Sequence, residues 1–99
     1  MEDSGRRDAG ARRLAWEVLY RTQRHGAYPD LLLAAQLDRA PGLPRPDRAL
    51  AQELVMGTLR WQASLDRALG QVSSRPLSRV PGKLLAALRM GAYQILFLE

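Results

Sequence analysis

Four arginines near the N-terminus are the residues whose type and spacing suggest chemistry most directly. They are Arg6, Arg7, Arg12 and Arg13. An arginine side chain presents a planar, permanently charged fork that binds phosphate through two hydrogen bonds and also stacks on bases. We therefore expect this cluster to contact nucleic-acid phosphates, with an affinity that falls as salt concentration rises. A solvated helix start is the alternative, although cations are slightly unfavourable at the positive end of a helix dipole.

Three aromatic residues lie close to this cluster in the sequence: Trp16, Tyr20 and Tyr28. Aromatic rings beside cationic side chains can stack on the unpaired bases of RNA. For Trp16, packing in or beside the core is the favoured interpretation. The role of Tyr28 stays open at this point.

The composition agrees with an electrostatic role. The 99 residues carry 15 basic and 10 acidic side chains, a net charge of +5, and 14 of the 15 basic residues are arginine. The resulting pI of about 10.7 is typical of a nucleic-acid-binding surface. RNA, DNA and anionic lipid are all compatible partners, and a GC-rich genome would also raise the arginine content.

The same counts argue against catalysis by this chain. With no cysteine there is no disulfide, thiolate metal site or cysteine nucleophile. His25 is the single histidine, so a site with several histidine ligands is excluded and a catalytic triad is barely possible. We therefore expect neither enzyme activity nor a cofactor or metal in this chain.

No targeting or membrane segment is predicted. The N-terminal residues include acids and have no apolar run, unlike a secretory signal. The longest charge-free apolar stretch, 90–98, has 9 residues, whereas a bilayer span needs about 20. The expectation is a cytoplasmic chain without a membrane partner.

The positioning elements are all predicted to be helices. Residues 1–8 are polar and are expected to form a flexible arm. An amphipathic helix follows from about Asp8 to His25, and Gly26 ends it. Asp30, after Pro29, is expected to cap a short helix over 31–39. The next stretch, 40–46, contains three prolines and a glycine and is predicted to be a stiff connector.

Two further helices complete the predicted fold. Asp47 is expected to cap one long helix from Arg48 to about Gln71, whose apolar stripe, including Trp61, is interpreted as core. Gly57 inside that helix predicts that another helix crosses close to it. The last helix, beginning near Ser78 or Val80, is apolar on almost every side and is expected to be buried among helices.

That last helix carries no stop signal before the sequence ends. We therefore expect an all-α bundle truncated after about four helices. An exposed side of the last helix would favour self-association.

Three stretches resemble a known family. They are ARRLAWEVLYRTQRHGAYPDLLL at 11–33, DRALAQELVMGTLRW at 47–61 followed by Leu65 and Asp66, and LRMGAYQILFL at 88–98. Together they resemble the NusB-like N-terminal domain of the RsmB (Sun/Fmu) family of small-subunit ribosomal RNA cytosine-C5 methyltransferases. The transcription antitermination factor NusB shares the fold but usually carries Glu where this chain has Gln94, which favours the methyltransferase branch.

The resemblance implies an orthogonal helical bundle of two three-helix subdomains that engages RNA. It covers residues 9–99 as a NusB-like RNA-binding domain that is incomplete at its C-terminus, with no methyltransferase domain present. Full-length relatives add a Rossmann-like S-adenosylmethionine domain whose reaction uses a cysteine, and this chain has none. Only the docking of ribosomal RNA is therefore carried over, to Arg6, Arg7, Arg12 and Arg13.

Arg48 and Arg60 are weaker candidates for RNA contact. Arg60 has an equally weighted structural alternative, in which it pairs with Glu53 or a helix end. The alternatives for the whole chain are a NusB-type antitermination factor or a module that docks a protein partner.

Overall fold

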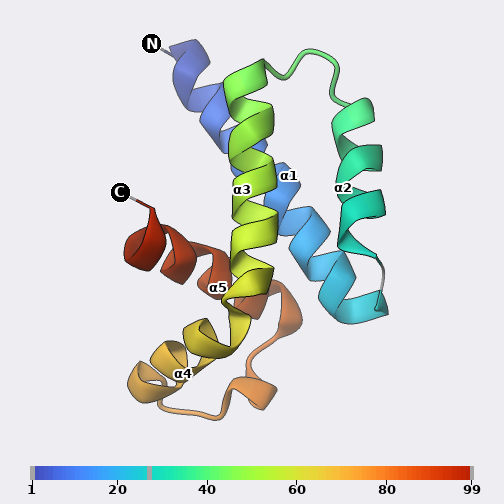
Figure 1. The fold of residues 1–99 in the computed structure, drawn as a ribbon. Helices are drawn as coiled ribbons and strands as arrows, with labels where there is room; N and C mark the ends of the chain where they lie inside the picture. The colour runs from blue at the N-terminus through green and yellow to red at the C-terminus, as the bar shows by residue number, and fades with distance from the viewer. Residues whose placement is uncertain (1, 27, 99) are drawn as a thin grey trace.

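The computed structural model describes residues 2–26 and 28–98, with side chains described from Gly10 onward. Its helices are α1 (Glu2–His25), α2 (Pro29–Asp38), α3 (Arg45–Arg60), α4 (Gln62–Val72) and α5 (Gly82–Phe97), with a short 3-10 turn, η1 (Leu77–Arg79), before α5 (Figure 1). No strand occurs within the described residues. The predicted all-α class is therefore confirmed.

The longest helix, α1, packs against α2, α3 and α5, and α5 also contacts α3 and α4. In Figure 1, α2 and α3 flank one part of α1, whereas α4 and α5 lie toward the C-terminal end of α3. The largest fully buried side chains come from α1, α3 and α4: Val18, Leu54, Val55, Thr58 and Leu65. One core thus joins the two groups of helices.

The predicted close approach at Gly57 is confirmed. The ring of Tyr93 from α5 lies against the α3 backbone at Gly57, where a Cβ atom would overlap the ring. The Tyr93 hydroxyl donates a hydrogen bond to the Glu53 carboxylate, one turn earlier on α3. Glycine is therefore required here for packing between helices.

The prediction of one long helix to about Gln71 is wrong, because the chain bends at Trp61. Trp61 has φ −103° and ψ 17°, outside helical geometry, and separates α3 from α4. Trp61 is 41% exposed, and its ring stacks on that of Phe97, with centroids 4.9 Å apart. The interpretation of Trp61 as core is therefore also wrong. The bend turns α4 toward α5 and leaves the ring at the junction.

The predicted helix starts also need correction. The backbone of α1 is helical from Glu2, so the helix begins before Asp8, whereas the flexibility expected of residues 1–8 stays a prediction. The caps of α2 and α3 are Tyr28 and Pro44, without a side-chain hydrogen bond, instead of Asp30 and Asp47. Both helices have a proline at their start, where its missing N–H costs nothing. Both aspartates lie in the first helical turn, where a carboxylate favours the helix dipole.

The last helix is covered on one side only. Within the described residues, Leu85, Ala86, Met90 and Tyr93 are its buried positions. The large apolar side chains Leu84, Leu88, Ile95, Leu96 and Phe97 are exposed. The burial expected for the whole helix is thus found on one side. The exposed apolar side chains lie on the opposite side, at Leu84, Leu88 and Ile95, and at the C-terminal end of the helix, at Leu96 and Phe97.

No helix in the described part of the chain is long and apolar enough to cross a membrane.

Candidate nucleic-acid interface

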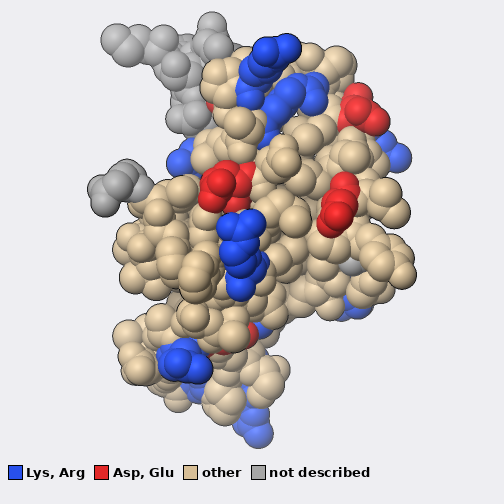
Figure 2. Space-filling view, viewed as in Figure 1, with Lys and Arg blue, Asp and Glu red and all other residues tan. Residues whose placement is uncertain are grey.

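One end of the bundle, here called the connector end, is rich in arginine. It comprises residues 10–13 of α1, the end of α2, the connector 39–44 and the first turn of α3. The connector reaches α1, since a Cβ atom on Gly10 would be 3.7 Å from Leu43 Cδ1. In Figure 2, basic side chains gather over the start of α3. The described arginines at this end are Arg12, Arg13, Arg39, Arg45 and Arg48.

Arg13 and Arg39 line the same groove between α1 and α2, which has a volume of about 230 Å³. Both side chains are exposed, as is Arg45 at the start of α3. Glu17 also lines the groove, but it forms an ion pair with Arg21 at 3.1 Å. Within the described side chains, none of Arg13, Arg39 and Arg45 forms an ion pair. Their positive charges are therefore available to an anionic ligand.

Arg48, in contrast, is bound to the connector. Its Nε donates a hydrogen bond to the carbonyl oxygen of Leu43 at 2.8 Å, and its Nη2 donates to that of Ala40. The Ala40 carbonyl oxygen also accepts the backbone N–H of Leu43 at 3.1 Å, whereas no backbone N–H among the described residues donates to the Leu43 carbonyl oxygen. The half-buried guanidinium of Arg48 thus supplies the donor that the Leu43 carbonyl oxygen lacks, and its two hydrogen bonds give it a structural role at the connector end.

Arg12 points to another side of α1 from Arg13. Its Nε donates to the side-chain oxygen of Gln94 on α5 at 2.8 Å. The Gln94 amide nitrogen in turn donates to the carbonyl oxygen of Met90 at 3.2 Å. Arg12 therefore connects α1 to α5 through Gln94, the residue that distinguishes this chain from most NusB sequences in the sequence comparison above.

Of the remaining predicted arginines, Arg60 does not join the described cluster. Arg60 ends α3, about 22 Å along the helix from Arg45. Its predicted ion pair with Glu53 is not found among the described residues. The Glu53 carboxylate instead accepts a hydrogen bond from the Tyr93 hydroxyl. That hydrogen bond, together with burial, raises the pKa of Tyr93 above 10.0, and the nearby Arg60 opposes the shift. The side chains of Arg6 and Arg7 lie outside the described residues.

The aromatic residues of α1 mainly fix the start of α5. Trp16 and Tyr20 stack with centroids 5.9 Å apart, and the Trp16 indole N–H donates to the carbonyl oxygen of Lys83 at 2.9 Å. The Lys83 ammonium lies 5.9 Å from the centroid of the Tyr20 ring. The packing interpretation of Trp16 is therefore confirmed. Tyr28 is 75% exposed and has no such contact among the described residues.

Sequence reasoning missed two features of the molecule, one at the connector end and one away from it. Arg39 and Arg45 were not singled out, although they flank the proline-rich connector, and a loop between antiparallel helices brings its two ends together. The second feature is a pocket on the opposite part of the bundle, where Arg89 is held by both oxygens of Asp66 at 2.7 and 2.9 Å. No spacing in the sequence connects these residues, because they come from different helices.

The fold and the connector end together define a small all-helical domain with a basic surface. The described residues contain no group of three or more histidine, aspartate or glutamate side chains placed to hold a metal ion. The model of the NusB family matches residues 9–99, and the chain belongs to that family.

Curated relatives include ribosomal RNA methyltransferases. The chain is 35% identical over 89 residues to a probable ribosomal RNA small subunit methyltransferase B of Synechocystis, covering 90% of this chain and 20% of that protein. It is 38% identical over 86 residues to a putative methyltransferase of Mycobacterium tuberculosis, covering 87% and 19%. A ribosomal RNA small subunit methyltransferase B of Pseudomonas putida is 37% identical over 65 residues, covering 66% and 14%.

The chain therefore spans about a fifth of the length of the curated relatives that it matches. No solved structure matches it. The resemblance to the RsmB family that was inferred from the sequence is confirmed by these relatives.

Proposed function

We propose that this chain is the RNA-docking, N-terminal part of a ribosomal RNA cytosine-C5 methyltransferase and that it binds RNA through the connector end. The observation that carries the proposal is the set of exposed arginines without an ion pair among the described residues: Arg13, Arg39 and Arg45. Two of the relatives are named as ribosomal RNA methyltransferases, and this supports RNA as the ligand.

The three side chains suit a phosphate backbone better than a base edge. Guanidinium groups around the shallow groove between α1 and α2 can each bind a phosphate through two hydrogen bonds. Phosphate contacts fix position and orientation without reading sequence. Arg6 and Arg7 extend the same surface in this proposal, and Arg12 and Arg48 hold the helices and connector that carry it.

Methyl transfer itself is assigned to a part of the longer relatives outside this chain. The cytosine-C5 reaction uses a cysteine thiolate, and this sequence contains no cysteine. S-adenosylmethionine would therefore bind elsewhere in a full-length protein, and this chain would bring the RNA to it.

The test compares two triple variants with the same change in charge. Arg13, Arg39 and Arg45 are replaced by Gln in one, and the exposed Arg67, Arg75 and Arg79 in the other. Binding of a fluorescent single-stranded ribosomal RNA fragment is measured by anisotropy over a range of salt concentrations. The first variant should bind more weakly, with the slope of log affinity against log salt shallower by about 2, whereas the second keeps the slope.

Equal effects of the two variants would show that net charge alone drives binding, and the connector end would lose its assigned role. An unchanged slope in the first variant would also contradict the proposal.

A second candidate function, docking of a protein, is favoured by the exposed apolar side chains around the end of α5. Trp61, Ile95, Leu96 and Phe97 are 41%, 82%, 57% and 42% exposed, and we call them the α5 end. Affinity capture from a ribonuclease-treated extract tests this candidate. A stoichiometric protein should be retained by the wild type and lost when Ile95 and Leu96 are replaced by Lys.

A further inference from the structure

The groove between α1 and α2 at the connector end is lined by two kinds of polar side chain. Arg13 from α1 and Arg39 from α2 are exposed. Leu14, Glu17 and Gln36, which also line the groove, are half-buried. The more exposed lining residues thus include the positive charges, and the more buried ones carry none. The volume of about 230 Å³ is below the range of about 300 to 1,000 Å³ for small-molecule sites, so the groove suits one base.

Glu17 and Gln36 have hydrogen-bonding capacity that the fold does not use. Glu17 Oε2 forms an ion pair with Arg21 Nε at 3.1 Å, and no group of the described residues donates to Oε1. The Glu17 side chain is 36% exposed, so a ligand can reach it. The Gln36 amide has no hydrogen bond within the described part of the chain. A carboxylate only accepts hydrogen bonds, whereas an amide both donates and accepts them.

These groups disfavour a phosphate inside the groove and favour a base with an amino group. The negative charge of Glu17 repels a phosphate, which binds instead to the exposed arginines. An unpaired base is neutral, and its amino group can donate to a carboxylate. Cytosine carries the amino group N4 where uracil carries the oxygen O4, an acceptor that a carboxylate repels. The groove therefore favours cytosine over uracil.

We propose that this groove binds one unpaired base with an exocyclic amino group, while Arg13 and Arg39 hold the neighbouring phosphates. Glu17 lies four residues after Arg13 on the same face of α1, about 6 Å along the helix. Gln36 lies three residues before Arg39 on α2. On both walls the groups for the base thus lie within one helical turn of the groups for the phosphates. The inference rests on the proposed function and adds base recognition to it.

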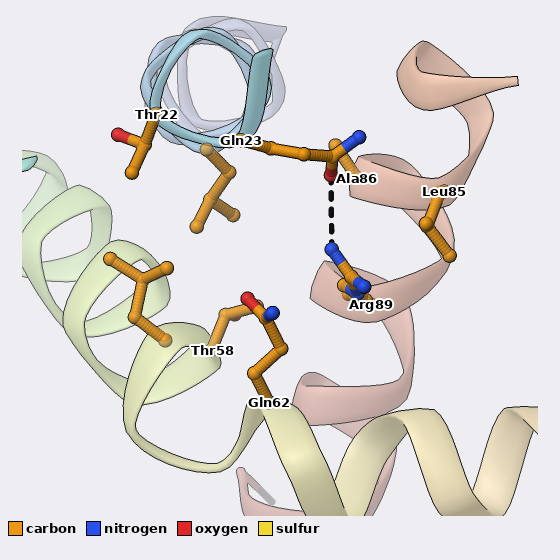
Figure 3. Close-up of a pocket in the computed structure, with 9 residues that line it drawn as sticks. Thr22, Gln23, Thr58, Gln62, Leu85, Ala86 and Arg89 are labelled. Atoms are coloured by element: carbon orange, nitrogen blue, oxygen red, sulfur yellow. Dashed lines mark hydrogen bonds between the residues drawn. The ribbon is translucent and has the colours of Figure 1, made fainter. Parts of the chain in front are cut away.

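The larger pocket of the bundle, with a volume of about 370 Å³, does not offer this arrangement. Figure 3 shows the Arg89 guanidinium hydrogen-bonded to Gln23, and the same group also donates to both oxygens of Asp66. The Oγ1 atoms of Thr22 and Thr58 are buried, so a ligand cannot reach them. No arginine of the connector end is among the described residues that line this pocket. The groove between α1 and α2, in contrast, combines accessible acceptors with arginines for phosphate.

The test compares cytidine-only with uridine-only RNA of equal length at neutral pH, where both bases are uncharged. Affinities are measured by fluorescence anisotropy. The wild type should bind the cytidine RNA about 5-fold more tightly, as expected for one specific base contact. In Glu17→Gln this ratio should fall below about 2-fold, because the amide nitrogen can donate to uracil O4. Loss of a negative charge strengthens the binding of both RNAs, so the ratio is the readout.

Control variants separate the base contact from the charge. Asp38→Asn removes the same charge from an exposed position at the end of α2, outside the groove lining. Arg21→Gln breaks the ion pair with Glu17 and leaves the carboxylate in place. Both should keep the wild-type ratio. Gln36→Met removes the amide and should weaken binding of the cytidine RNA by about 2-fold to 5-fold, with the salt slope unchanged.

A wild type that binds the two RNAs equally, or a ratio that Glu17→Gln leaves unchanged, would overturn the base site. A ratio that falls equally in Asp38→Asn would show an effect of charge alone and would also overturn it. The proposed function survives these results if the triple variant of Arg13, Arg39 and Arg45 still shows the shallower salt slope. A ratio that depends on Glu17, together with a salt slope that ignores these arginines, would keep the base site and contradict the proposed function.

Discussion

The connector end and the α5 end expose opposite kinds of side chain on the same small bundle. At the connector end, proline and the hydrogen bonds of Arg48 fix the backbone, and Arg13, Arg39 and Arg45 remain exposed. At the α5 end, Phe97 stacks on Trp61 and on Tyr93, with centroids 4.9 and 5.4 Å apart, and its apolar neighbours stay exposed. Exposed charge is well solvated, whereas clustered apolar side chains indicate a surface that another chain segment or protein covers.

The contact between Gly57 and Tyr93 decides which side of α5 belongs to the core. Gly57→Ala places a methyl group inside the Tyr93 ring, and the rigid aromatic ring cannot yield without moving α5. We expect a loss of about 1 to 3 kcal/mol in the free energy of unfolding, measured by urea denaturation.

Gly70→Ala is the matched control, because no atom lies within 4 Å of a Cβ at this position in α4. It should stabilise the fold by about 0.5 to 1 kcal/mol, since alanine favours the helix. Similar effects of the two changes would mean that α5 is not packed on α3 as described. The distinction between a buried and an exposed side of α5 would then be wrong.

Two arginines of the connector end have different roles. Arg48 holds the connector in place, whereas the exposed Arg45 is available to bind a ligand. Arg48→Ala removes the donors to two connector carbonyl oxygens and should cost about 1 to 3 kcal/mol in the free energy of unfolding. Arg45→Ala should change it by less than about 0.5 kcal/mol, because the side chain is exposed and has no ion pair with any described carboxylate. Urea denaturation measures both changes. An equal loss of stability in both variants would remove the distinction between the two roles.

The hydrogen bond from Tyr93 to Glu53 makes stability depend on alkaline pH. It raises the pKa of the Tyr93 hydroxyl, so the folded chain keeps this proton more strongly than the unfolded chain does. The contribution to stability is full below the unfolded pKa of about 10 and is lost as pH rises through the higher folded value.

Urea denaturation over an alkaline pH series should show this decline in the wild type and a smaller decline in Tyr93→Phe. Tyr28→Phe is the control, because Tyr28 is exposed and should leave the pH profile unchanged. A wild-type profile that Tyr93→Phe does not alter would contradict the assignment.

Local patterns in the sequence predicted the helices and one tertiary contact. Apolar periodicity predicted α1, and a glycine inside an apolar stripe predicted the crossing at Gly57. The bend at Trp61 could not be predicted this way, because the apolar positions before and after it continue one helical period. The bend depends on contacts of α4 and Trp61 with α5, which a local pattern does not contain.

The candidate sites show the same limit. The arginine cluster on α1 was visible because its members are neighbours in the sequence, whereas Arg39 and Arg45 reach the same end only through the connector. The pocket that contains Arg89 is lined by residues of four helices, α1, α3, α4 and α5, and these residues are far apart in the sequence. Knowledge of the helix packing is therefore needed to find it.

The smallest change in stability is expected at the α5 end. This prediction tests whether the exposed apolar side chains there form one interaction surface. Replacing Ile95 and Leu96 together by Lys should alter the free energy of unfolding by less than about 0.5 kcal/mol per site, because both side chains are already exposed. The wild type should bind a hydrophobic dye and sediment faster as its concentration rises, and the double variant should do neither. Val72→Lys is the control, since Val72 is 84% exposed and lies outside the α5 end. A wild type that stays monomeric and binds no dye would mean that these apolar side chains do not act as one surface, and only the connector end would remain as an interaction site.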